Sequence, residues 1–129
     1  MVKKEIKNWL DSAQYDLESA EHMFNSGRYI YTIFMCHLAI EKVLKAKAEE
    51  KTGKKPPKTH NLLYLVKLAR ISLCEEMLQF IGDINNLSIV TRYPEDFEEM
   101  LKAFSKERTK VFLNKSEEVF RWIKKLITS

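Results

Sequence analysis

Three ionisable residues recur at intervals of four in the middle of the chain. His37, Glu41 and Lys45 lie within the segment 29–51, whose apolar residues predict a helix. A spacing of four places the three side chains on one face of that helix and lets Glu41 and Lys45 form an ion pair. A carboxylate among Ile and Phe side chains is costly to bury without partners. The stripe therefore either orders a helix bundle or forms one wall of a polar groove.

In the second interpretation an arginine stands opposite Glu41. Arg92 and Arg108 are the two candidates, and neither interpretation is decided by the sequence. Structural ion-pair networks are common, so the stripe alone does not establish a site.

Familiar catalytic and metal-binding patterns are missing from the sequence. Three glycines do not make a phosphate-binding loop, and there is no His-Glu-x-x-His or paired-Cys metal motif. His22, His37 and His60 lie on different predicted segments, so only tertiary packing would unite them. We therefore expect no catalytic residue, no metal and no cofactor.

The hydrophobic pattern predicts helices almost throughout the chain. Helices are expected over 6–24, 29–51, about 62–69, from 72 to about 90, and 105–127, with a helical turn or two over 97–104. Four long segments with mostly short connections predict an all-α fold, an antiparallel up-and-down bundle of four to five helices in one domain over 1–129.

Local signals place the helix ends. Gly27 suits a left-handed cap after the first helix. Thr59, His60 or Asn61 is expected to cap the third helix. Ser72 and Glu75 have the spacing of a capping box that opens the fourth.

The second helix has no clean polar face in its first half. The stretch Tyr29–Ile40 is apolar almost all round, so it must be covered on several sides. We expect this helix to be central to the bundle or to form an oligomer interface, and we predict a homodimer. Trp9 and Trp122 are expected to pack in the core or in that interface.

Charge and composition exclude several classes of function. The formal net charge of +4 is scattered, which argues against a DNA partner. Its one local concentration, Lys51, Lys54, Lys55 and Lys58, is most simply a solvated loop. No apolar run is long enough to cross a bilayer, and the start has no signal-peptide pattern, so we expect a cytoplasmic protein without a membrane partner.

An ordered set of motifs resembles a known family. The set is Trp9-Leu10-x-x-Ala13-x-x-Asp16-Leu17-x-x-Ala20, Gly27-Arg28-Tyr29, His37-Leu-Ala-Ile-Glu41-Lys42-x-Leu44-Lys45-Ala46, Thr59-His60-Asn61-Leu62-x-x-Leu65 and Thr91-Arg92-Tyr93-Pro94. In this order and spacing the chain resembles a HEPN domain (higher eukaryotes and prokaryotes nucleotide-binding) over nearly its whole length. The resemblance implies a bundle of four or five helices, usually dimeric. It also implies a prokaryotic protein paired with a minimal nucleotidyltransferase, in a toxin–antitoxin-like arrangement, or a ribonuclease toxin.

The ribonuclease branch of that family carries an Arg followed, after four to six residues, by a His. No Arg of this chain has a His in that window, and Asn114 stands there after Arg108. Asn does not titrate near neutral pH, so it cannot serve as a general acid or base. The departure favours a non-catalytic member.

By analogy with the family, a groove between the long helices would bind a nucleotide or another phosphorylated ligand. The guanidinium groups of Arg92 and Arg108 suit phosphate oxygens, and Tyr93 either stacks on a base or packs where the helix stops. The implied groove residues are His37, Glu41, Lys45, Arg92, Tyr93 and Arg108.

Two alternatives remain open. One is a metal-independent RNA endonuclease with an altered site, in which Arg92 or Arg108 stabilises charge and His37 titrates. The other is a plain homodimeric interaction module.

Overall fold

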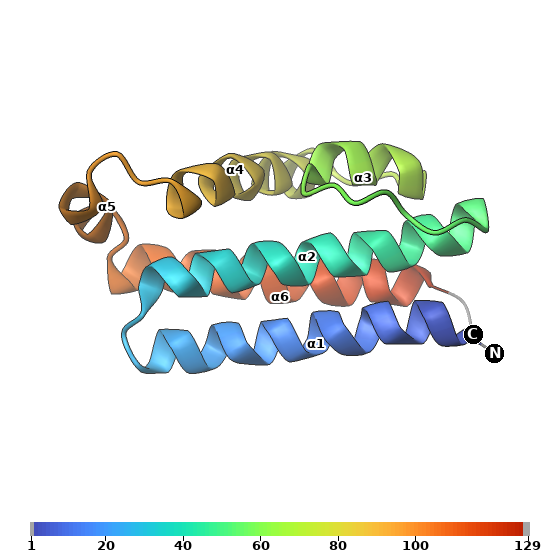
Figure 1. The fold of residues 1–129 in the computed structure, drawn as a ribbon, viewed down its shortest axis with the longest axis horizontal. Helices are drawn as coiled ribbons and strands as arrows, with labels where there is room; N and C mark the ends of the chain where they lie inside the picture. Colours follow the sequence, from blue (N-terminus) through green and yellow to red (C-terminus); the bar gives the residue numbers. More distant parts are fainter. Residues whose placement is uncertain (1, 128–129) are drawn as a thin grey trace.

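The chain forms six helices in the computed structural model, which describes residues 2–127 (Figure 1). They are α1 (Lys4–Asn25), α2 (Tyr29–Thr52), α3 (Leu62–Ala69), α4 (Glu75–Arg92), α5 (Phe97–Ala103) and α6 (Lys106–Leu126). The long helices alternate in direction along the chain, and α1, α2 and α6 lie alongside one another with α3 and α4 over α2 (Figure 1). The predicted all-α bundle is confirmed.

The second helix is the centre of the molecule. α2 packs against α1, α3, α4 and α6, so its side chains are covered from several directions. Within the apolar stretch Tyr29–Ile40, Tyr31 is the one residue classed as exposed, at 57%. The central position therefore accounts for this stretch within one chain, and the homodimer prediction loses its original motive.

Most helix ends follow the expected local chemistry. Gly27 and Gly53 adopt φ of 77° and 71°, a left-handed conformation that costs glycine little. Asn61 caps α3 by accepting a hydrogen bond from the Tyr64 amide at 3.2 Å. Ser105 caps α6 in the same way through the Arg108 amide.

The prediction of a capping box at Ser72 and Glu75 is wrong. α4 begins after Cys74, whose side chain makes no capping hydrogen bond, so Ser72 lies outside the helix. The two acidic residues in the first turn, Glu75 and Glu76, instead complement the positive end of the helix dipole.

The cysteines differ in environment. Cys36 is buried in the core and Cys74 is exposed, and both are free thiols. Burial raises the pKa of the Cys36 thiol to about 12, so it behaves as a small apolar side chain.

No helix within residues 2–127 is long and apolar enough to cross a membrane.

Candidate ligand-binding site

A group of ionisable side chains lies where α2 meets the 53–61 loop and the end of α4. We call it the polar cluster, and its members are His37, Glu41, Lys45, His60 and Arg92. The stripe of residues spaced by four faces inward on α2, and the side chains of His37, Glu41 and Lys45 are all less than a tenth exposed. The loop folds back from the end of α2 and brings His60 against them.

Glu41 is the centre of this cluster because both of its carboxylate oxygens have partners. Its Oε2 accepts a hydrogen bond from Lys45 Nζ at 3.1 Å, and its Oε1 accepts one from His60 Nδ1 at 2.8 Å. The predicted Glu41–Lys45 pair is thus present. Lys45 Nζ also lies 5.5 Å from the centre of the partly buried Trp9 ring, which further offsets the cost of burying a cation.

His37 anchors the loop and does not face solvent. Its Nε2 donates to the backbone carbonyl of His60 at 3.1 Å, which fixes the tautomer because a carbonyl only accepts. Its Nδ1 lies 3.8 Å from Glu41 Oε1 without a hydrogen bond. Burial lowers the pKa of His37 to about 4, despite the nearby Glu41 carboxylate, so the ring is neutral at pH 7. The titrating role considered for His37 in an altered nuclease does not fit this environment.

His60 is the functional candidate that sequence reasoning missed. Its side chain is 60% exposed while its Nδ1–H is held by the buried Glu41, so Nε2 remains available at the surface. A ring held in this way can accept a hydrogen bond from a ligand through Nε2. In the sequence His60 is a possible helix cap, one of three separated histidines and part of the HEPN-like motif, but no spacing rule connects it with Glu41.

Arg92 is the member of the polar cluster whose charge is unpaired. Its guanidinium carbon is 4.9 Å from the centre of the Phe34 ring, and its Nε is buried without a hydrogen-bond partner. No carboxylate of the described residues forms an ion pair with it. Its positive charge is one of the causes that lower the pKa of His37, which places it within electrostatic reach of the cluster.

The other two predicted groove residues lie elsewhere. Tyr93 and Arg108 line a cleft of about 850 Å³ between the end of α4, α5 and the start of α6, which we call the terminal cleft. Arg108 Nη1 donates to the Ala103 carbonyl at 3.0 Å, and its guanidinium lies over the Phe104 ring at 4.9 Å. Of the two arginines predicted as alternatives opposite Glu41, Arg108 therefore lies elsewhere, and the single predicted groove separates into two places.

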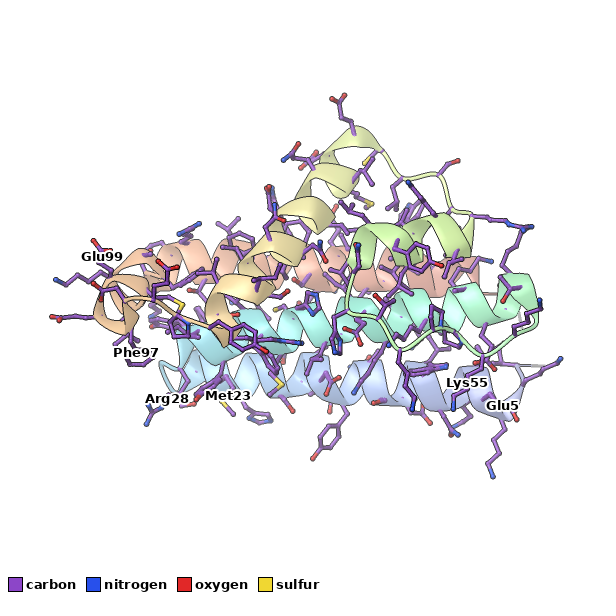
Figure 2. The ribbon with its side chains drawn as sticks, turned by 45° about the horizontal axis from the view of Figure 1, so that its top comes forward. Glu5, Met23, Arg28, Lys55, Phe97 and Glu99 are labelled. Carbon is purple, nitrogen blue, oxygen red and sulfur yellow. The ribbon has the colours of Figure 1, made fainter. Side chains whose placement is uncertain are left out.

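The terminal cleft combines carboxylates with exposed apolar side chains. Acidic residues from the α4–α5 connection and α5 line it, together with Lys102 and Arg108. The most exposed apolar residues of the region are Ile89, Val90, Tyr93, Phe97 and Leu101, with Tyr93 at 77%. Figure 2 shows Phe97 and Glu99 at the same end of the bundle as Arg28 in the α1–α2 turn. This mixture fits a protein surface better than a phosphate.

Comparison with known proteins identifies the fold. The HEPN domain model matches residues 6–126. The chain belongs to the HEPN family. Comparison with curated proteins gives no significant match.

Two solved structures share the HEPN fold of this chain at low sequence identity. TT1696 from Thermus thermophilus has a TM-score of 0.82 at 18% identity, covering 97% of this chain and 100% of its own. ST0689, described as an archaeal HEPN homologue, has a TM-score of 0.78 at 19% identity, covering 95% and 98% respectively. At these identities the likeness establishes the fold alone.

The polar cluster of this HEPN fold brings buried and exposed ionisable side chains together without forming a metal site among the described residues. No group of three or more His, Cys, Asp or Glu among residues 2–127 is arranged to hold a metal ion. The cluster contains the unpaired guanidinium of Arg92, the exposed imidazole edge of His60 and the Glu41 carboxylate, whose two oxygens already accept hydrogen bonds.

Proposed function

We propose that this HEPN protein binds a nucleotide or another phosphorylated ligand at the polar cluster without catalysing a reaction on it. The observation that carries the proposal is Arg92, a partly buried residue of the cluster whose guanidinium has no carboxylate partner in the described chain. A guanidinium fork pairs well with two phosphate oxygens, and such charge-assisted hydrogen bonds are the stronger kind.

The charges of the cluster favour an anion. Glu41 is offset by Lys45, His37 is neutral at pH 7, and the charge of Arg92 is left over. Exposed His60 Nε2 lies on the same cluster and can accept a hydrogen bond from a ligand hydroxyl. Fixed charges already held in place need little reorganisation when a ligand binds.

Thermal unfolding with a panel of nucleotides and inorganic phosphate tests this proposal. A ligand that binds only the folded state raises the melting temperature, by an amount that grows with its concentration above the dissociation constant. Arg92→Gln should abolish the ligand response, whereas Arg28→Gln, which removes an exposed arginine at the start of α2, should preserve it. No response across the panel, or equal responses in both variants, would contradict the proposal.

The partner proposal follows from the family and concerns the terminal cleft. We propose that its exposed apolar residues form a homodimer face or receive a minimal nucleotidyltransferase in a cytoplasmic, toxin–antitoxin-like pair. An apolar patch that mixes both signs of charge is self-complementary, as an isologous interface requires. Light scattering at micromolar concentration should give a dimer, and Val90→Asp, which changes an exposed apolar residue lining the cleft, should convert it to a monomer. A strictly monomeric wild-type protein would contradict the proposed homodimer.

Ribonuclease activity is the second candidate, and one contact favours it. The buried Glu41 holds His60 Nδ1–H at 2.8 Å and leaves Nε2 at the surface, which is the arrangement of a base and its orienting carboxylate. The missing Arg-to-His motif still weighs against activity, so we predict no metal-independent cleavage of single-stranded RNA. Cleavage that His60→Gln abolishes and His22→Gln retains would overturn the non-catalytic proposal.

A further inference from the structure

A second cationic site lies at the far end of α2, away from the polar cluster. Lys51, Lys54, Lys55 and Arg70 line one hollow of about 550 Å³, formed where the 53–61 loop leaves α2 and passes the end of α3. We call it the basic hollow. Lys51 follows Glu41 by ten residues on the same helix, which corresponds to roughly 15 Å along the axis.

The charge of the basic hollow is uncompensated. No acidic residue lines it, and none of its four cationic side chains forms an ion pair within residues 2–127. Other lysines of the chain do find carboxylates, for example Lys42 with Asp16 at 2.7 Å. Lys55 also borders a neighbouring pocket with Glu5, and Figure 2 shows these two residues at the same end of the bundle. The remaining three cations face no carboxylate in the hollow.

Helix ends explain part of this charge but not its concentration. A cation near a helix C-terminus complements the helix dipole, which accounts for Lys51 in the last turn of α2 and Arg70 after α3. Lys54 and Lys55 lie beyond both helices. Arg70 is moreover the one non-glycine residue with positive φ in the described chain, at 51°, where glycine or asparagine is usual. An arginine is unusual in that conformation because its Cβ disfavours the left-handed region.

The remaining wall of the basic hollow is largely apolar. Tyr64, 46% exposed, lines the hollow together with Leu68 and the Pro56–Pro57 pair. An exposed aromatic ring beside cations suits a base stacked on the ring and phosphates on the charges. The volume lies within the range of small-molecule sites.

We propose that the basic hollow binds a phosphoanhydride chain, as found in a nucleoside triphosphate or in free tripolyphosphate. Several adjacent negative charges match the cations of the hollow, whereas a single phosphate would leave most of them unpaired. The site is separate from the polar cluster and does not depend on the function proposed there.

Calorimetric titration of the full chain with tripolyphosphate and with ATP, both without metal, tests the proposal at fixed ionic strength. The double variant Lys51→Gln/Arg70→Gln should weaken both affinities at least ten-fold. The control Arg28→Gln/Lys106→Gln removes the same charge from exposed positions at the other end of the bundle and should change them less than two-fold. Tyr64→Leu distinguishes the sources: loss for ATP alone identifies a nucleotide, and no loss identifies the free chain.

Three results would overturn the proposal. The first is no saturable binding of either compound to the wild type. The second is equal weakening in the double variant and its control, which would indicate diffuse charge attraction. The third is a loss caused by Arg92→Gln but not by Lys51→Gln/Arg70→Gln. That last result would place the ligand at the polar cluster and leave the proposed function standing.

Discussion

Two glutamates on this bundle experience opposite surroundings. Glu41 on α2 is 5% exposed and meets Lys45 and His60, so each carboxylate oxygen has a donor. Glu117 on α6 is more exposed, yet burial and the neighbouring Glu21 carboxyl on α1 raise its pKa above the usual value. Arg121, 3.9 Å away, offsets this only in part. The comparison teaches that the partners of a carboxylate, more than its depth, decide whether its charge stabilises the fold.

The largest expected effect comes from breaking the Glu41 pairings. Glu41→Gln replaces one of the two acceptor oxygens by an NH₂ group, so Lys45 and His60 can no longer both find an acceptor. The buried charge of Lys45 also loses its counter-charge. We expect a loss of roughly 3 to 5 kcal/mol in the free energy of unfolding, because removing one partner of a buried pair leaves an uncompensated charge. Urea unfolding at pH 7 measures it, with Glu118→Gln on the exposed face of α6 as the control.

A double variant sharpens this prediction. Glu41→Gln/Lys45→Met removes both buried charges, so its loss should be clearly smaller than the sum of the single losses. Additive losses would show that the two side chains act independently.

The next effect is a pH dependence caused by His37. The pKa of His37 is about 4 in the folded protein and near 6.5 in the unfolded chain. Between these pH values the unfolded chain therefore binds a proton that the folded protein does not bind. Stability is then full above about pH 6.5 and falls as the pH drops towards 4, by about 3 kcal/mol in all. His37→Gln should flatten this part of the stability curve.

The control for this prediction is His22, which is exposed on α1. His22→Gln should leave the slope between pH 6.5 and 4 unchanged. A wild-type protein whose stability does not change over that interval would contradict the neutral, buried His37.

Glu117 should change stability with pH in the opposite direction to His37. Because its folded pKa is raised, its stabilising contribution is present below its usual pKa of 4.5 and is lost as the pH rises through the folded value. Glu117→Gln should therefore raise the melting temperature at pH 7. The gain in the free energy of unfolding should be less than about 1 kcal/mol, because the side chain is partly solvated. The gain should vanish near pH 4, and a loss of stability at pH 7 would break the comparison with Glu41.

The smallest effect is expected from an exposed ion pair with a short distance. Lys7 Nζ and Asp11 Oδ2 are 2.6 Å apart, closer than Glu41 and Lys45, but their side chains are 68% and 62% exposed. Asp11→Asn should change stability by no more than about 0.5 kcal/mol, since solvent screens such pairs. A larger change, measured by urea unfolding, would mean that distance matters more than burial on this surface.

The elements of the fold were largely predictable from the sequence because their causes are local. Apolar periodicity placed the long helices to within a few residues, Gly27 marked a left-handed cap, and the spacing of His37, Glu41 and Lys45 put them on one face. The capping box at Ser72 failed because a matching pair of residue types does not fix where the helix begins.

The site was predictable only in part, because it depends on contacts between distant segments. The spacing of residues along α2 was enough to predict a polar stripe that needs partners. That His60 supplies one of these partners, and that Arg108 turns towards Ala103 and Phe104 instead, follows from how the chain packs. The path of the 53–61 loop and the place of α5 at the end of the bundle bring residues together or keep them apart, and helical periodicity carries no information about either (Figure 1).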